Sequence, residues 1–250
     1  MPTLSLRLKK GRQVKMGEEQ IRNAQFPVTG LSKERNTWDV RSGEISFSGK
    51  VQNLCVCFID MIGSTKISSD LPPAQLSRYY EIFLNAIALI AKNFEARIVK
   101  NAGDALIFYF DDVNDPNNTL KFKRILDCCL TMGLANSALN AKMLNENQPP
   151  IKYRISAEYG PISVARSISS QSDDLFGTAM NISAKINSIA KPSGLVIGLN
   201  LFDVVKGLDE YRFSRSDVPL TNAQGVNAAY HVEEMEKRDF INPFERKPAN

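Results

Sequence analysis

Residues 99–110 read VKNAGDALIFYF. Apolar and β-branched residues flank a single polar interruption, which is the pattern of two strands joined by a tight turn. Gly103 supplies the permissive backbone that such a turn needs. Lys100 and Asp104 lie beside it. A hairpin tip tolerates any polar pair, but a cation and a carboxylate held by two rigid strands can also form a site.

The residues around this hairpin predict an alternation of strands and helices. The stretch KVQNLCVCFID, residues 50–60, is apolar on both faces and predicts a central strand. A helix is predicted from Pro73, which suits a first turn. A second long helix is predicted over 119–145, and 151–160 predicts a strand that turns at Gly160-Pro161. This order, β-α-β-β-α-β, is that of the ferredoxin-like split βαβ arrangement.

The C-terminal part extends this core. It predicts a helix over about 178–190, a strand in GLVIGL, a short helix and a final strand pair near 210–214 and 227–233. The fold class is therefore α+β. We assign residues 46–236 to one domain, 1–45 to a basic N-terminal arm and 237–250 to a C-terminal tail.

Composition excludes several classes of protein. The chain has 250 residues, of which 43% are hydrophobic and 23% charged, so wholesale disorder is not expected. Much of the net charge of +4 comes from the start of the arm, where five cations precede the first acid, Glu18. Such an arm can touch nucleic acid or anionic lipid, but a solvated arm is the favoured interpretation, so nucleic acid is not expected as a partner.

Neither a membrane span nor a signal peptide is predicted, and the expected location is the cytoplasm. The best apolar segment is interrupted by Asn85 and Lys92. The four cysteines lie inside predicted strand and helix and are interpreted as reduced core thiols. The only histidine is His231, so Ser-His and Cys-His mechanisms are disfavoured. An enzyme of this sequence has to rely on carboxylates and metal.

Two aspartates are the candidates for that chemistry. Asp60 ends the first strand and Asp104 lies at the hairpin tip; in a split βαβ sheet these two segments are neighbours. Two carboxylates, with water and phosphate oxygens, suit Mg²⁺ or Mn²⁺. The segment MIGSTK (61–66) precedes a helix and offers backbone amides that can cradle phosphate. Taken singly, each aspartate is more often structural; together with the amide segment they favour a metal site.

Three motifs resemble a known family. CFIDMIGST (57–65), KNAGD (100–104) and DLFGTAMNISAK (174–185) fall, in order and spacing, where class III adenylate and guanylate cyclases carry their catalytic motifs. The resemblance covers roughly residues 50–235 and implies the class III cyclase fold. It also implies lyase activity, in which the ribose 3′-hydroxyl of a nucleoside triphosphate attacks the α-phosphate and pyrophosphate leaves.

The resemblance assigns the metal and phosphate contacts. It implies two metal ions per site, held by Asp60 and Asp104 with help from the backbone of Met61. It further implies phosphate contacts from a set of three backbone amides and one arginine: Gly63, Ser64, Thr65 and Arg154. An arginine fork suits a phosphate, although an exposed strand arginine also forms ordinary surface ion pairs.

The residues that read the base in these cyclases correspond, by the resemblance, to Lys100 and Asp174. A lysine with an aspartate is similar to the pattern of adenylate cyclases. Adenine presents an acceptor beside an amino donor, so a cation and a carboxylate fit that edge. Cytosine presents the same order, so hydrogen bonding alone does not exclude CTP. Both residues also have structural interpretations: Lys100 as a solvated hairpin lysine and Asp174 as a loop residue.

On the later helix the resemblance places a ribose-orienting asparagine at Asn181 and a transition-state arginine at Lys185. Lysine keeps the charge but loses the planar fork, which implies a slower or differently tuned enzyme. Active sites in the family form between two domains, so the resemblance implies a homodimer. The leading hypothesis is an adenylate cyclase that makes cyclic AMP from ATP. The alternatives are a cyclase for GTP or a pyrimidine triphosphate, or a nucleotide-binding regulatory module without turnover.

Overall fold

The computed structural model describes residues 4–7, 13–16, 45–167, 173–217, 220–222 and 225–235. The chain divides into two units, residues 1–45 and 46–250. In the first unit, β1 (Leu4–Arg7) pairs antiparallel with β2 (Gln13–Met16). This pair falls in the segment assigned to the basic arm, where no strand was predicted. The assigned C-terminal tail, 237–250, lies outside the described residues.

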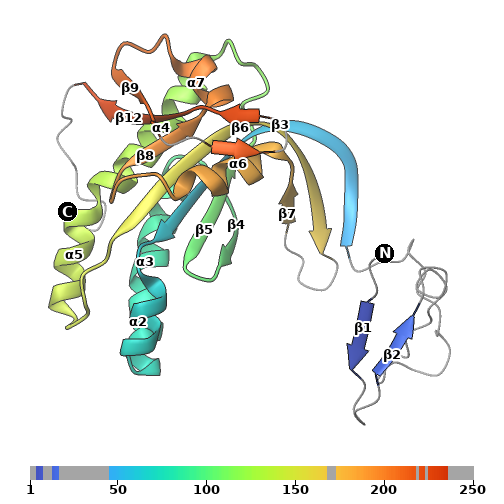
Figure 1. Cartoon of the computed structure of the whole chain (residues 1–250). Helices are drawn as coiled ribbons and strands as arrows, with labels where there is room; N and C mark the ends of the chain where they lie inside the picture. Colours follow the sequence, from blue (N-terminus) through green and yellow to red (C-terminus); the bar gives the residue numbers. More distant parts are fainter. Residues whose placement is uncertain are drawn as a thin grey trace. The chain divides into compact units, whose positions relative to one another are not determined.

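Within its described residues, the second unit is built on an eight-stranded sheet with the order β4-β5-β3-β6-β8-β12-β9, and β7 pairs with β6 off this path (Figure 1). Its strands are β3 (Ile45–Met61), β4 (Arg97–Ala102), β5 (Ala105–Phe110), β6 (Tyr153–Ser167), β7 (Asp173–Phe176), β8 (Leu195–Gly198), β9 (Tyr211–Arg215) and β12 (Ala229–Glu234). A separate two-stranded ribbon consists of β10 (Leu220–Asn222) and β11 (Gly225–Asn227).

The order β4-β5-β3-β6 confirms the predicted ferredoxin-like core. β3 is central, as its two apolar faces indicated, because it lies between β5 and β6. The hairpin is also confirmed. Ala102 pairs with Ala105, and Gly103 takes a positive φ of 64° at the first turn position, where glycine is favoured. The C-terminal strand pair is β9 with β12.

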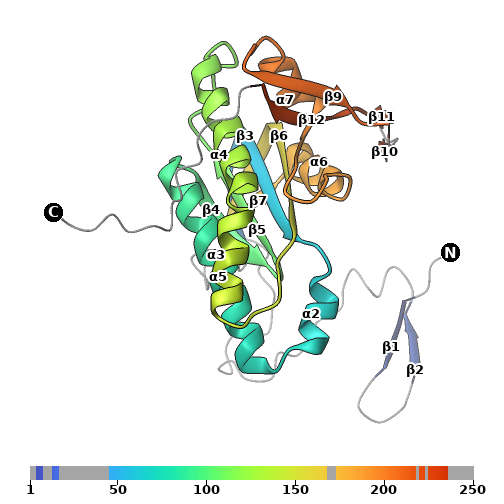
Figure 2. The ribbon, with the colours of Figure 1, turned by 90° about the vertical axis from the view of Figure 1, so that its left-hand side faces the viewer.

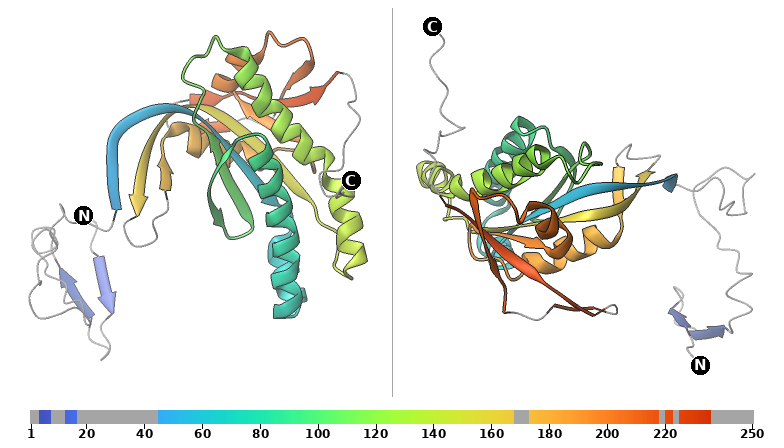
Figure 3. Two further views of the ribbon diagram at one scale, coloured as in Figure 1. Left: turned by 180° about the vertical axis from the view of Figure 1, so that it is seen from behind. Right: turned by 90° about the horizontal axis from the view of Figure 1, so that it is seen from above.

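Helices cover both faces of the sheet (Figures 2 and 3). They are α2 (Ser64–Asp70), α3 (Pro73–Asn93), α4 (Thr119–Leu134), α5 (Asn136–Asn145), α6 (Thr178–Asn187) and α7 (Leu199–Val205). Buried side chains of α3, α4, α5 and α7 share one core with alternate residues of β3, β5 and β6. α6 packs on the opposite face through Ala179 and Ile186. Near the end of β3, the even-numbered residues lie on the face of the sheet that α6 covers. Asp60 is one of them.

Three details of the predicted β-α-β-β-α-β core differ from the structure. The segment before Pro73 contains an additional short helix, α2. The long second helix is interrupted at Ala135, between α4 and α5. The turn predicted at Gly160-Pro161 is wrong, because β6 runs through it. Pro161 lies between the residues of β6 that pair with β8 (155–157) and those that pair with β7 (163–166).

Buried thiols and a buried carboxyl are among the described side chains of this unit. All four cysteines are free and fully buried, as predicted, and the sulfurs of Cys57 and Cys129 are 4.0 Å apart. Glu158 is 1% exposed, and its Oε1 accepts hydrogen bonds from the backbone N–H groups of Tyr159 (2.8 Å) and Leu201 (2.9 Å). Burial raises the pKa of Glu158 to about 7.

No helix in the described ranges is both long and apolar enough for a bilayer.

Candidate active site

The two candidate carboxylates lie side by side where β3 and β5 begin to pair. Asp60 is opposite Ala105, the residue that follows Asp104 in the hairpin. Both aspartates are partly buried. Burial raises the pKa of the Asp60 carboxyl, and the charge of Asp104 and a hydrogen bond with it raise this pKa further; the charge of Arg154 acts in the opposite direction. The site is therefore a concentration of negative charge that a cation would relieve.

The segment after Asp60 turns sharply into α2. Met61 ends β3 with its side chain 3% exposed in the core. Gly63 adopts a φ of 79° at the N-cap, and its carbonyl accepts hydrogen bonds from the N–H groups of Lys66 and Ile67. Ser64 and Thr65 are thus the first residues of a helix rather than part of a loop. Amides of a first helical turn have no acceptor within their own helix, so they remain suited to an anion.

Arg154 approaches the site from β6. Its Nη1 donates a hydrogen bond of 2.8 Å to the carbonyl oxygen of Ser188, just after α6. Its Nε is buried and has no hydrogen-bond partner in the described part of the chain. The charge of Arg154 also favours ionised Asp60. The structure therefore brings together Asp60, Asp104 and Arg154, each from a different segment.

The two candidate base-reading residues lie on other strands. Lys100 is opposite Ile107, directly after an irregularity of β4 between Ile98 and Lys100. Its side chain lies outside the described residues. Asp174 is opposite Ala165 of β6, and its Oδ1 accepts a hydrogen bond of 3.2 Å from the N–H of Leu175. Asp174 was predicted in a loop or a site; it is in β7.

Asn181 and Lys185 lie one turn apart on α6, and both are exposed. No described hydrogen bond or ion pair links either side chain to Asp60 or Asp104.

Three buried polar residues near the site were missed by the sequence prediction. Ser156, Ser183 and Asn187 are 0%, 0% and 4% exposed. Ser183 and Asn187 are four residues apart on α6, facing β6, and interrupt the run of isoleucines that packs this helix. A polar pair at that spacing within an apolar helix is a signal that the sequence contained.

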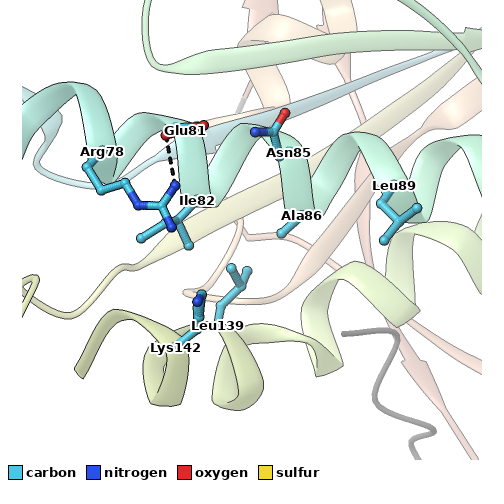
Figure 4. Close-up of a pocket in the computed structure, with 8 residues that line it drawn as sticks. All are labelled: Arg78, Glu81, Ile82, Asn85, Ala86, Leu89, Leu139 and Lys142. Atoms are coloured by element: carbon cyan, nitrogen blue, oxygen red, sulfur yellow. Dashed lines mark hydrogen bonds and ion pairs between the residues drawn. The ribbon is translucent and has the colours of Figure 1, made fainter. Parts of the chain in front are cut away.

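A groove of about 350 Å³ lies away from these residues, between α3 and α5 (Figure 4). Its floor includes Ile82, Ala86 and Leu139, while Arg78 and Lys142 lie at its rim. None of the candidate site residues lines it. The carboxylate pair, not this groove, is the candidate site.

The chain is similar to known nucleotide cyclases. The family model described as "Adenylate and Guanylate cyclase catalytic domain" matches residues 47–234. The chain belongs to this cyclase family. Its fold is that of the solved cyclases: the adenylyl cyclase CyaB from P. aeruginosa superposes with a TM-score of 0.67, at 16% identity, over 75% of this chain and 97% of that one. The guanylate cyclase domain of RhGC from Catenaria anguillulae, solved in complex with GTP, superposes with a TM-score of 0.59, at 18% identity, over 75% and 100%.

A curated cyclase is also similar. The cytidylate cyclase of Staphylococcus aureus is 22% identical over 217 residues, which cover 82% of this chain and 51% of that protein. The chain spans about half the length of this curated relative. Cyclases named for three different bases are thus similar to this domain.

Proposed function

We propose that this domain converts ATP into 3′,5′-cyclic AMP and pyrophosphate in a homodimer. The observation that carries the proposal is the pairing of Asp60 with Asp104 at the end of β3, beside Arg154. Two carboxylates next to a guanidinium form a site for cations and phosphates together. The 3′-oxygen of the ribose forms a bond to the α-phosphorus, the bond to the bridging oxygen breaks, and the hydroxyl proton is released.

The donor set fits hard divalent ions such as Mg²⁺ or Mn²⁺. Asp60 and Asp104 supply oxygen ligands, and burial, together with the charge of Asp104, raises the pKa of the Asp60 carboxyl. Among the described residues, no group of three or more His, Cys, Asp or Glu side chains gathers to hold a metal. The backbone of Met61, water and substrate phosphates would complete the shell, as is usual for Mg²⁺. When bound, two ions would make the ribose hydroxyl more acidic and neutralise the departing pyrophosphate.

The protein's own residues bind and orient the substrate in this proposal. The amides of Gly63, Ser64 and Thr65 hold phosphate oxygens at the start of α2, and the guanidinium of Arg154 contacts the triphosphate. Asn181 orients the ribose, and Lys185 places positive charge where negative charge builds on the phosphate in the transition state.

The resemblance to cyclases, whose active sites form between two domains, supports a homodimer. Asp60 and Asp104 of one protomer would meet Asn181 and Lys185 of its partner, which gives two equivalent sites. The proposal predicts that an isolated protomer is inactive.

The base is read by Lys100 and Asp174 in this proposal, which favours ATP by resemblance to adenylate cyclases. CTP is the second candidate, because the curated relative that aligns with 82% of the chain is a cytidylate cyclase. Adenine and cytosine both present an acceptor beside an amino donor, whereas guanine and uracil present a carbonyl oxygen beside an N–H. We therefore propose ATP first, CTP second, and neither GTP nor UTP as the preferred substrate.

The deciding experiment is incubation with all four ribonucleoside triphosphates together in Mn²⁺, followed by identification of cyclic products by mass spectrometry. We expect cyclic AMP as the main product of the wild type, and a yield at least about a hundredfold lower from Asp60→Asn. The exposed Asp209 provides a matched control, since Asp209→Asn should leave the yield unchanged. Cyclic CMP as the main product would establish the second candidate. Nucleotide binding without any cyclic product would overturn the proposal in favour of a regulatory module.

A further inference from the structure

One buried side chain joins three elements that carry candidate site residues. Asn187 is the last residue of α6, and its Nδ2 lies 3.4 Å from the carbonyl oxygen of Phe58, 3.3 Å from that of Arg154 and 3.2 Å from the Oγ of Ser156. A side-chain amide nitrogen has only two hydrogens, so these are shared among three acceptors on β3 and β6. Asn187 therefore ties α6 to both strands at once.

A second hydrogen bond holds the same helix against β6. The Oγ of Ser156 donates a 2.8 Å hydrogen bond to the carbonyl oxygen of Ser183, and the two hydroxyl oxygens are 3.3 Å apart. We call Ser156, Ser183 and Asn187 the polar clasp. Apolar contacts such as those of Ile186 tolerate sliding, whereas hydrogen bonds are directional and fix a helix along a strand.

The polar clasp contacts the backbone of β3 and of β6 close to the candidate site residues. Phe58 lies two residues before Asp60, on the same face of β3. Arg154 is itself a candidate phosphate ligand, and its Nη1 is held by the carbonyl oxygen of Ser188, the residue after Asn187. Because the Nε of Arg154 has no partner in the described chain, the direction of the guanidinium depends on how β6 and the end of α6 are placed.

Burying these polar groups does not serve stability alone. A buried amide costs free energy unless its hydrogen bonds are made, and the hydrogen bonds of Asn187 are long and shared. The adjoining core positions of α6 are occupied by isoleucine. A polar residue at this junction is therefore better explained by directionality than by burial.

We propose that Asn187 is a positioning residue that sets the spacing between Asp60 and Arg154 and the placement of α6, which carries Asn181 and Lys185. The assignment rests on the proposed function, because it gives these four residues their roles. Asn187 itself touches no substrate; it acts through the backbone of β3 and β6.

The kinetic test compares Asn187→Ala with Gln148→Ala. Gln148 is a buried amide outside the site, so its truncation is a matched control for loss of stability. We expect Asn187→Ala to lower kcat about tenfold to a hundredfold, as loss of an orienting partner does in other sites. KM and the affinity for a 3′-deoxy nucleotide should stay within about threefold. Gln148→Ala should leave kcat per folded molecule unchanged. A wild-type kcat in Asn187→Ala, or an equal loss in Gln148→Ala, overturns the assignment.

A second measurement needs no turnover. The Nε–H of Arg154, assigned by its loss in Arg154→Lys, should exchange slowly with solvent in the wild type because this nitrogen is buried. Asn187→Ala should accelerate that exchange at least about tenfold relative to Gln148→Ala. If Asn187→Ala does not fold, Ser156→Ala should produce the same change on a smaller scale, while Ser156→Thr retains the hydroxyl and should restore it. Unchanged exchange in the folded variants overturns the proposal, even if the wild type cyclises no nucleotide.

Discussion

At the scale of single residues, the pairing of Asp60 with Asp104 is the feature on which the proposed chemistry depends most directly. Replacing Asp60 with asparagine keeps the shape but removes the negative charge that holds a divalent ion. We expect Asp60→Asn to lower turnover by about a hundredfold or more at saturating Mn²⁺. Product formation is measured by chromatography, with circular dichroism as the check on folding. A variant that keeps wild-type turnover would exclude Asp60 as a metal ligand.

The same pair makes a prediction in the absence of metal. The charge of Asp104 raises the pKa of the Asp60 carboxyl. Asp104→Asn removes this like charge, so the pKa of Asp60 should fall, and Asp60 should ionise at a lower pH than in the wild type. Carbon-13 NMR titration of the aspartate carboxyls measures this directly. An unchanged titration would mean that the charge of Asp104 does not contribute to the pKa of Asp60.

Lys185 is one position at which the resemblance implies a departure from the family pattern. An arginine there would offer a planar set of donors to the phosphate in addition to the charge. We expect Lys185→Arg to raise kcat severalfold, with little change in KM. Initial rates at several nucleotide concentrations provide both constants. A collapse of kcat would show instead that the site is shaped around lysine.

At the scale of elements, the contact between β6 and α7 contains a titrating group. The pKa of Glu158 is raised to about 7, from 4.5 in the unfolded chain. A raised carboxyl pKa stabilises the fold fully below about pH 4.5, and this contribution is lost as the pH rises through 7. The loss is on the order of 3 kcal/mol.

Glu158→Gln should therefore flatten the fall in thermal stability between pH 5 and 8. Glutamine keeps an oxygen that can accept the N–H groups of Tyr159 and Leu201. Melting curves across this range test the expectation, with the exposed Glu233→Gln as the control. Equal slopes in the wild type and Glu158→Gln would show that Glu158 does not titrate in this range.

Local patterns predicted most elements because their causes are local. Gly103 between two apolar runs indicated the hairpin, and Pro73 indicated the start of α3. The turn expected at Gly160-Pro161 failed because the fate of a proline depends on which strands are paired beside it. Gly160 and Pro161 alone do not indicate those partners, because β7 and β8 follow later in the chain.

At the scale of the whole molecule, the proposed homodimer makes a complementation test possible. Asp60→Asn disables the carboxylate half of a site, and Lys185→Ala disables the helical half. In a mixed dimer one site carries both defects and the other carries neither. Random exchange of protomers should therefore restore about a quarter of the wild-type activity from two inactive variants. Activity of the mixture no higher than that of either variant would contradict sites shared between protomers.

The candidate site was predictable to the extent that its residues fall in recognisable motifs. The strand order then placed Asp60 beside Asp104, as expected of a split βαβ sheet. The polar clasp was not predicted, because Ser156 and Asn187 are 31 residues apart and meet only after α6 has packed on β6. Contacts of this kind depend on tertiary packing and not on any single segment.

The reactivity of the four buried thiols can show how often the domain opens transiently. Cys55 and Cys57 on β3 and Cys128 and Cys129 on α4 are hidden from solvent, so an alkylating reagent reaches them only in molecules whose strand and helix have parted. The rate of alkylation therefore counts such openings. Any ligand that prefers the closed form must slow it in proportion to its occupancy. Candidate nucleotides can therefore be ranked by how much each one lowers the alkylation rate, before any product is analysed.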